Sequence, residues 1–169
     1  KRRPRRNRNL EPSEDPFQIA LEAYERAVEI DPKHPDAQLH YALFLDRAGR
    51  GEDAERAHKA AVEAAATIPE LAPDYYVAYG RFLAARRGRL QEAVDQYEFA
   101  RMFRQNDLEI QREIATVHGR IGQEYFENEQ YSLAEQSLSM AYGMFPDKND
   151  AEAQKVAETL AELRSIRVR

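Results

Sequence analysis

Residues 121–146, IGQEYFENEQYSLAEQSLSMAYGMFP, carry the pattern that decides the fold. The first part places a large apolar residue, a glycine and an aromatic residue on one face of a helix: Ile121, Gly122 and Tyr125. After a turn near Asn128, a second helical face has a bulky residue between two alanines: Ala134, Leu138 and Ala141. Small residues let two helices approach closely, and Pro146 ends the second helix. The stretch therefore predicts an antiparallel helix hairpin.

The second-helix pattern occurs four times along the chain, at spacings of 34, 39 and 41 residues. Each copy is a triplet on one helix face: Ala20, Tyr24 and Ala27; Ala54, His58 and Ala61; Ala93, Tyr97 and Ala100; Ala134, Leu138 and Ala141. A first helix precedes each of the three later copies. The first copy has no visible partner upstream, so its helix should either pack on the second unit only or continue a longer array.

This order of residues resembles the tetratricopeptide repeat (TPR) family over about residues 16 to 146. The last unit follows the family's order of large apolar, glycine, aromatic, alanine, bulky, alanine and proline residues. The second unit departs from it, with Ala42 in the glycine position and Ala66 in the closing-proline position. The third unit admits two registers. We prefer the register that puts Gly80 in the glycine position and lengthens the hairpin turn by one residue, because the other would put Arg81 in a tightly packed slot.

The resemblance implies an all-α fold, a right-handed α-solenoid of antiparallel helix hairpins with about 3.5 repeats and a C-terminal capping helix. We expect a basic arm over residues 1–15, helical repeats over 16–148 and the capping helix with a short basic tail over 149–169. The capping helix has an apolar stripe: Ala153, Val156, Ala157, Leu160 and Leu163. The expected helices are Pro16–Ile30, Pro35–Ala48, Gly51–Thr67, Asp74–Arg87, Leu90–Arg104, Asp107–Asn128, Tyr131–Phe145 and Asn149–Ile166.

The composition excludes several classes of protein. The chain has 169 residues and no cysteine, which excludes disulfide scaffolds, thiolate zinc sites, iron–sulfur clusters and cysteine nucleophiles. Charged residues make up 33% of the chain, and no run approaches the roughly 18 apolar residues of a membrane-spanning helix. No apolar stretch typical of a signal peptide follows the basic start. We therefore expect an intracellular protein, cytoplasmic or organellar.

Charge is concentrated at the N-terminus. Six of the 25 basic residues lie in the first nine positions, which contain no acid: Lys1, Arg2, Arg3, Arg5, Arg6 and Arg8. The remaining residues comprise 19 basic and 30 acidic ones, a net charge of about −11. We interpret the start as an extended arm that binds polyanions, because its prolines disfavour a helix and its arginines would neutralise phosphates.

No catalytic or metal-binding pattern is present. The sequence has neither a phosphate-binding loop nor a Gly-x-Ser-x-Gly elbow, and none of its four histidines belongs to a His-Glu-x-x-His motif. His58 takes the bulky slot of a triplet, so we expect a packed ring there. We therefore predict that the protein is not an enzyme and has no catalytic residues, cofactor, metal or small-molecule substrate.

Stacked helix hairpins have a concave face lined by their first helices, and in the TPR family this groove binds a peptide. The expected partner-binding residues are His40, Leu43, Arg47, Val77, Arg81, Arg120, Gln123 and Glu127. Arg81 and Arg120 should face one groove and bind an acidic or carboxylate-bearing segment. The alternative is that each pairs with a local acid such as Asp46, Glu124 or Glu127.

Two function classes follow from this reading. The leading prediction is a non-catalytic protein–protein interaction scaffold or assembly factor of a multiprotein complex. The alternative is an RNA-associated protein with half-a-TPR (HAT)-like character that uses the arginine arm. The carboxylate clamp of one TPR subclass is not expected, because its places hold mostly other residues: Leu39, His40, Leu43, Asp74 and Ala78.

Overall fold

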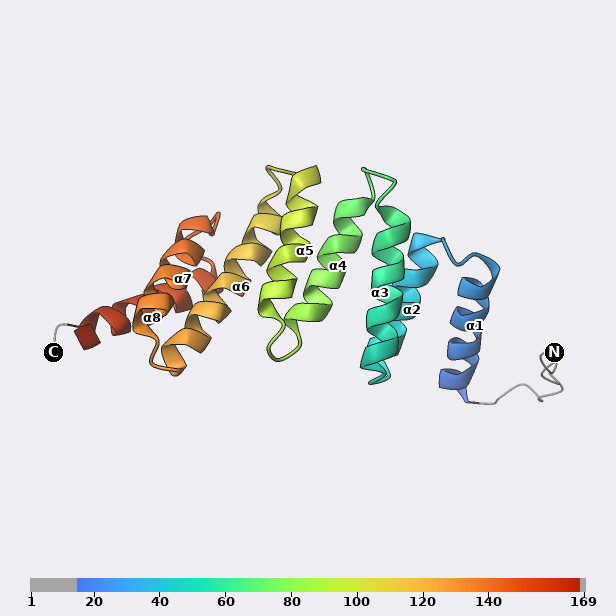
Figure 1. Ribbon diagram of the computed structural model, residues 1–169, viewed down its shortest axis with the longest axis horizontal. Helices are drawn as coiled ribbons and strands as arrows, with labels where there is room; N and C mark the ends of the chain where they lie inside the picture. The colour runs from blue at the N-terminus through green and yellow to red at the C-terminus, as the bar shows by residue number, and fades with distance from the viewer. Residues whose placement is uncertain (1–14, 168–169) are drawn as a thin grey trace, which may run out of the picture. The chain divides into compact units, whose positions relative to one another are not determined.

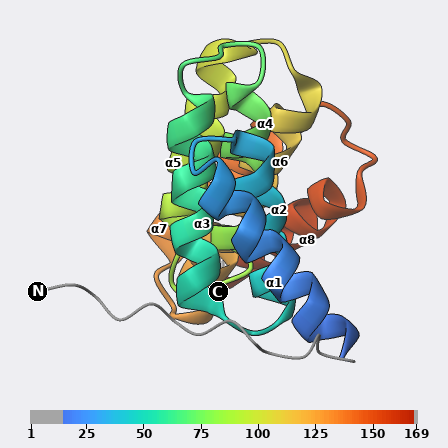
Figure 2. The same ribbon diagram turned by 90° about the vertical axis from the view of Figure 1, so that its right-hand side faces the viewer.

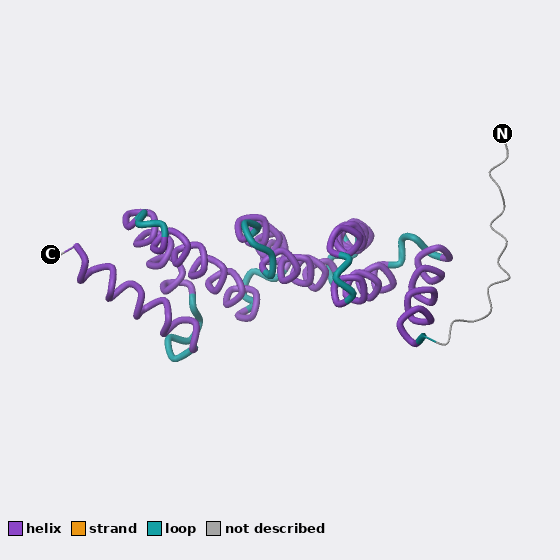
Figure 3. Tube along the Cα trace, turned by 90° about the horizontal axis from the view of Figure 1, so that it is seen from below, coloured by secondary structure: helices purple, strands orange, loops and turns teal. Residues whose placement is uncertain are grey.

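The computed structural model describes residues 15–167, which form helices and connecting turns with no strand among them (Figures 1 and 3). The helices are α1 (Pro16–Ile30), α2 (Pro35–Arg47), α3 (Gly51–Ala65), α4 (Ala72–Ala84), α5 (Leu90–Phe103), α6 (Leu108–Glu127), α7 (Tyr131–Met144) and α8 (Ala151–Arg167). The all-α prediction is confirmed. The described residues divide into two compact units, 15–61 and 62–167, with the division inside α3. Each unit is described by itself below.

The helix boundaries differ most from the predicted ones at α4. This helix begins at Ala72, two residues before the predicted start, because Pro73 fits the first helical turn, where its missing N–H is not needed. It ends at Ala84, three residues before the predicted end. The turn that follows contains Gly88 with a φ of +75°, a conformation that favours glycine and that an α-helix does not contain.

The N-terminal unit contains α1, α2 and most of α3. The Asp15 carboxylate caps α1 by accepting a hydrogen bond from the Phe17 backbone N–H at 3.0 Å. α1 packs beside α2 (Figure 2). Aromatic rings join the two helices: the Phe17 and Phe44 ring centroids are 4.9 Å apart, and those of Tyr24 and Phe44 are 5.2 Å apart. α1 therefore packs on α2, the first helix of the second repeat.

The C-terminal unit contains two antiparallel hairpins, α4–α5 and α6–α7, followed by α8 (Figure 1). Two glycines let the helices of each hairpin touch. A Cβ built on Gly80 would lie 2.6 Å from Tyr97 Cε1, and one built on Gly122 would lie 2.6 Å from Leu138 Cγ. Gly80 thus occupies the same position in its hairpin as Gly122 does in the next one. The separation along the chain between the glycine and the triplet residue that it contacts is one residue longer for Gly80 and Tyr97 than for Gly122 and Leu138. This geometry supports the preferred register of the third repeat.

The repeated triplets form the centre of the packing. In the three later copies every member is at most 1% exposed: Ala54, His58, Ala61, Ala93, Tyr97, Ala100, Ala134, Leu138 and Ala141. The expected burial of His58 is therefore confirmed. At the C-terminal end, four residues of the predicted stripe of α8 are buried on the α6–α7 hairpin: Ala153, Val156, Leu160 and Leu163. Ala157, the fifth, stays half-buried.

Candidate functional site

The first helices of the C-terminal unit, α4 and α6, together with α8, form a surface that we call the first-helix face. α6 contacts α8 directly, and ion pairs connect α4 to α6. The sequence predicts partner binding on α4 and α6 of this face and on α2 of the N-terminal unit.

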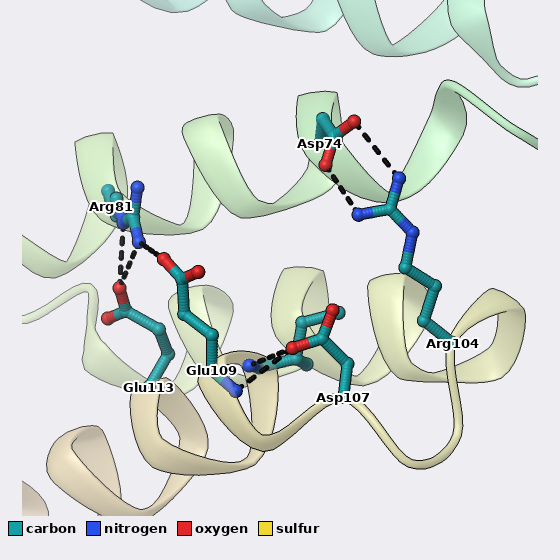
Figure 4. Close-up of polar contacts among 7 residues, drawn as sticks. Asp74, Arg81, Arg104, Asp107, Glu109 and Glu113 are labelled. Atoms are coloured by element: carbon teal, nitrogen blue, oxygen red, sulfur yellow. Dashed lines mark hydrogen bonds and ion pairs between the residues drawn. The ribbon is translucent and has the colours of Figure 1, made fainter.

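Arg81 on α4 joins α6 through two carboxylates (Figure 4). Its Nε donates a hydrogen bond to Glu113 Oε1 at 2.7 Å, and its Nη2 donates one to Glu109 Oε1 at 2.6 Å. Partial burial lowers the pKa of Arg81, but the hydrogen bonds to Glu113 and Glu109 outweigh this effect, so the pKa is raised. Local pairing of Arg81 is therefore what the structure shows, with Glu109 and Glu113 as the acids and not those considered from the sequence.

Two further ion pairs position the ends of helices. Arg104, at the end of α5, holds both carboxylate oxygens of Asp74 on α4, with Nη1–Oδ1 at 2.7 Å and Nη2–Oδ2 at 3.0 Å (Figure 4). Arg112 on α6 donates from Nε to Asp150 Oδ2 at 2.6 Å. Asp150 also accepts the Glu152 backbone N–H at 2.8 Å, at the start of α8. The Arg112 guanidinium and this backbone donor lower the pKa of Asp150.

A cavity of about 380 Å³ lies between α6 and α8. Its apolar lining comes from Gly119, Leu138 and Val156, and its polar lining from Thr116, Arg120, Gln123, Glu152, Lys155, Glu158 and Thr159. A Cβ on Gly119 would lie 2.7 Å from Val156 Cγ2, so only glycine lets α8 approach α6 this closely without a shift. The Thr159 hydroxyl donates to Gln123 Oε1 at 3.1 Å and connects the two helices across the cavity.

Arg120 is the cation that this cavity offers to a ligand. Its side chain is exposed, and it forms no ion pair with any residue between 15 and 167. Lys155, the other basic residue of the lining, is already paired with Glu152 at 2.8 Å. The Thr116 hydroxyl is buried and has no hydrogen-bond partner within the described part of the chain. The cavity thus combines a free positive charge with an apolar floor.

The structure groups only some of the predicted partner-binding residues. Arg120 and Gln123 line the cavity, Glu127 accepts a hydrogen bond from Gln123 at 3.1 Å, and Val77 lies half-buried on α4. The other three predicted residues of the helical part belong to the N-terminal unit, where they are exposed on α2: His40, Leu43 and Arg47. The predicted polyanion-binding residues of the arm, Arg2, Arg3, Arg5, Arg6 and Arg8, lie outside the described residues.

Sequence reasoning missed the contribution of α8 to the site. The sequence predicts only that this helix caps the end of the array and shields it from solvent. In the structure, its Lys155, Glu158 and Thr159 also line the cavity. The available signal was Gly119, because an isolated glycine within a helical pattern marks a close approach of another element.

Neither a metal centre nor a bilayer-spanning helix is found in the described residues. Between residues 15 and 167, no three side chains of His, Cys, Asp or Glu type come together in a way that could hold a metal ion. The helices there are too short or too polar to cross a bilayer.

Comparisons with known proteins relate this geometry to a family. The tetratricopeptide repeat family model matches residues 17–85. No curated protein sequence matches the chain. Among solved structures, MamA is 21% identical, with 90% of this chain and 91% of MamA covered and a TM-score of 0.53. YrrB, described as a TPR protein with an unusual peptide-binding site, is 15% identical over 88% of this chain and 78% of YrrB, with a TM-score of 0.51.

BtubC (BKLC) from P. vanneervenii is 18% identical over 89% of this chain, with a TM-score of 0.50. The chain spans 64% of the length of BtubC. Identities this low establish the fold and not a shared partner. The TPR fold is a scaffold that presents extended surfaces for protein–protein interaction. Residues 17–85 therefore match the tetratricopeptide repeat family model, and the chain has the fold of TPR proteins.

Proposed function

We propose that the chain is a non-catalytic protein-interaction scaffold or assembly factor that binds a partner segment on the first-helix face of its C-terminal unit. The observation that carries this proposal is the cavity between α6 and α8, with Arg120 exposed at its edge and unpaired among the described residues. An unpaired guanidinium beside an apolar floor suits a segment that carries a carboxylate next to an apolar side chain. An arginine fork can bind a carboxylate with two parallel hydrogen bonds.

The neighbouring groups have supporting roles in this proposal. Arg81 is held by Glu109 and Glu113, so it orders the face and has less charge to offer a partner than Arg120. Leu138 and Val156 supply apolar contact at the floor. Glu152 and Glu158 also line the cavity, and they would oppose a segment with several consecutive acids. The partner segment is therefore expected to have one or two carboxylates and an apolar residue, and not a long acidic run.

A peptide-display selection tests the proposal. Libraries of random peptides, with either a free C-terminus or a blocked one, are selected against the whole 169-residue chain. We expect the selected peptides to contain a carboxylate beside an apolar residue. Binding of a selected peptide to the Arg120→Ala variant should be weaker by on the order of tenfold or more, as expected for a lost charged anchor. Arg120→Glu should weaken it further.

Arg87→Ala provides the matched control, because Arg87 is an exposed arginine in the turn between α4 and α5. It should bind the selected peptide as the wild type does. Circular dichroism of each variant checks that the helices are intact. Unchanged binding by Arg120→Ala and Arg120→Glu would remove this cavity from the binding surface. The alternative of RNA binding depends on the arm, and the deletion described in the Discussion tests it.

A further inference from the structure

The cavity between α6 and α8 is lined by four charged side chains, and only two of them are paired with each other. Lys155 Nζ and Glu152 Oε1 lie 2.8 Å apart on α8, so these two charges largely cancel. Arg120 on α6 and Glu158 on α8 line the same cavity, and neither side chain forms an ion pair within the part of the chain that the structure describes. Both residues are exposed. The cavity therefore offers a ligand one unpaired charge of each sign.

The two unpaired charges come from opposite walls of the cavity and from the same level along its length. Two contacts between the walls bracket this level: Gly119 with Val156, and Gln123 with Thr159. Arg120 lies between the two contact residues of α6, and Glu158 lies between those of α8. Each bracketed stretch is about one helical turn, or roughly 5 to 6 Å along the axis. A single short ligand can therefore reach both charges at once.

Elsewhere along the same two helices, opposite charges do meet. Arg112 on α6 and Asp150, just before α8, form an ion pair with Nε and Oδ2 2.6 Å apart. No ion pair joins Arg120 to Glu158, although both line the space of about 380 Å³ between α6 and α8. The pairing that closes one end of this interface is thus missing at the cavity. The open space leaves room for a ligand that places one charge against each wall.

We propose that the cavity binds a short segment of a partner protein that carries an acidic and a basic side chain close to an apolar one. This proposal rests on the proposed function above and adds the basic residue to it. The carboxylate of the segment binds Arg120, its basic group binds Glu158, and its apolar side chain contacts Leu138 and Val156. Because an extended chain advances about 3.3 Å per residue, the acid and the base should lie within about three residues of each other. Each wall repels the charge that the other attracts, so the segment binds in one orientation.

Peptide selection against a charge variant tests the proposal. The libraries described above are selected in parallel against the wild type and Glu158→Lys. The wild type should enrich peptides with a lysine or arginine close to the carboxylate, whereas Glu158→Lys should keep the carboxylate and lose the basic residue. A peptide selected by the wild type is then made in two forms, with its basic residue or with glutamine in that place.

Fluorescence anisotropy compares the two forms. The basic form should bind the wild type about two- to fivefold more tightly than the glutamine form, as expected for an exposed ion pair. This preference should disappear in Glu158→Gln, and in the wild type it should diminish as salt is added. Glu162→Gln is the matched control, because Glu162 is an exposed acid about one turn later on α8 and does not line the cavity. It should keep the preference of the wild type.

Two results would overturn the proposal. One is equal binding of the two forms by the wild type, as expected if Arg120 and Glu158 pair with each other instead. The other is a preference for the basic form that persists in Glu158→Gln. In either case, weaker binding by Arg120→Ala would still support the proposed function. Binding that neither Arg120→Ala nor Glu158→Gln changes would remove both.

Discussion

Glycine residues within the helices of this protein have different physical roles at different positions. Gly122 lies on α6 where a Cβ would be 2.6 Å from Leu138 Cγ and 3.0 Å from the Leu138 backbone nitrogen. Gly143 lies on α7, and a Cβ there would meet no atom within 4 Å. The same residue type is thus required by packing at one site and carries only a conformational cost at the other.

This contrast predicts opposite effects of one substitution. Gly122→Ala should destabilise the protein by about 1 to 3 kcal/mol, because the backbone nitrogen that limits the space cannot move like a flexible side chain. Gly143→Ala should instead stabilise it by up to about 1 kcal/mol, since alanine is the better helix former. Urea unfolding of the two variants measures both values. A Gly122→Ala variant as stable as the wild type would mean that α6 and α7 are not in this register.

His118 makes the stability depend on pH. Burial lowers the pKa of this imidazole, and the negative charge of Glu98 opposes the shift. The unfolded chain therefore binds a proton more readily than the folded chain as the pH falls below about 6.5. The free energy of unfolding should decrease from that pH downward and level off once the folded imidazole is also protonated.

The measurement is urea unfolding of the wild type and of His118→Gln between pH 7.5 and pH 5. The variant should lose less stability over this interval than the wild type. His40→Gln, on the exposed face of α2, is the control for removal of a histidine. If the wild type and His118→Gln have the same pH dependence, His118 is not the group responsible.

Each helix hairpin of the C-terminal unit is held together by the same contact: the buried triplet of its second helix packs against its first helix. The Ala93 side chain is fully buried in α5, and its neighbour in the triplet, Tyr97, fits against Gly80. Burial and the nearby Glu113 carboxylate raise the pKa of Tyr97, so its phenol stays protonated at any ordinary pH. The triplet thus leaves no room for a larger or charged side chain at its alanine positions.

Ala93→Arg should therefore lower the free energy of unfolding by at least about 2 to 3 kcal/mol, since it both overpacks the hairpin and buries a charge. Thermal unfolding followed by circular dichroism provides the measurement. Ala85→Arg is the matched control, because Ala85 is exposed at the end of α4, and it should leave the melting temperature nearly unchanged. Equal melting temperatures for Ala93→Arg and the wild type would show that the triplet is not a packed contact.

Charge is unevenly shared over the whole molecule. The chain has a formal net charge of −5, and without its first eight residues this becomes about −11. Deletion of residues 1–8 should leave the melting temperature of the helical part nearly unchanged, because the packed triplets and glycine contacts all lie beyond residue 15. The deletion should also weaken binding to a polyanion, and the loss should diminish as salt is added.

Fluorescence anisotropy with a labelled single-stranded RNA oligonucleotide measures this binding at several salt concentrations. A wild type that binds with a steep salt dependence, together with a deletion variant that does not bind, would support the RNA alternative. No binding by either chain would remove it. Unfolding of the deletion variant would show instead that the arm belongs to the core.

The all-α hairpin fold, the approximate positions of the helices and the packed triplets can be predicted from the sequence, because they depend on local periodicity. Helix propensity, a helical spacing of apolar residues and small residues at contact positions are all readable along one stretch of chain. The preferred register of the third repeat also followed from local chemistry, since Arg81 could not occupy the slot that Gly80 fills against Tyr97.

The pairing of the charged residues could not be predicted from the sequence, because it depends on which helices pack side by side. Arg81 and Arg120 look alike in sequence, yet Glu109 and Glu113 neutralise the first, while the second lines a cavity without an ion pair among residues 15–167. The role of α8 in the cavity, which its polar side chains line, also could not be predicted from the sequence. Long charged side chains reach partners some 30 residues away along the chain, and that choice depends on how the helices stack and not on any local pattern.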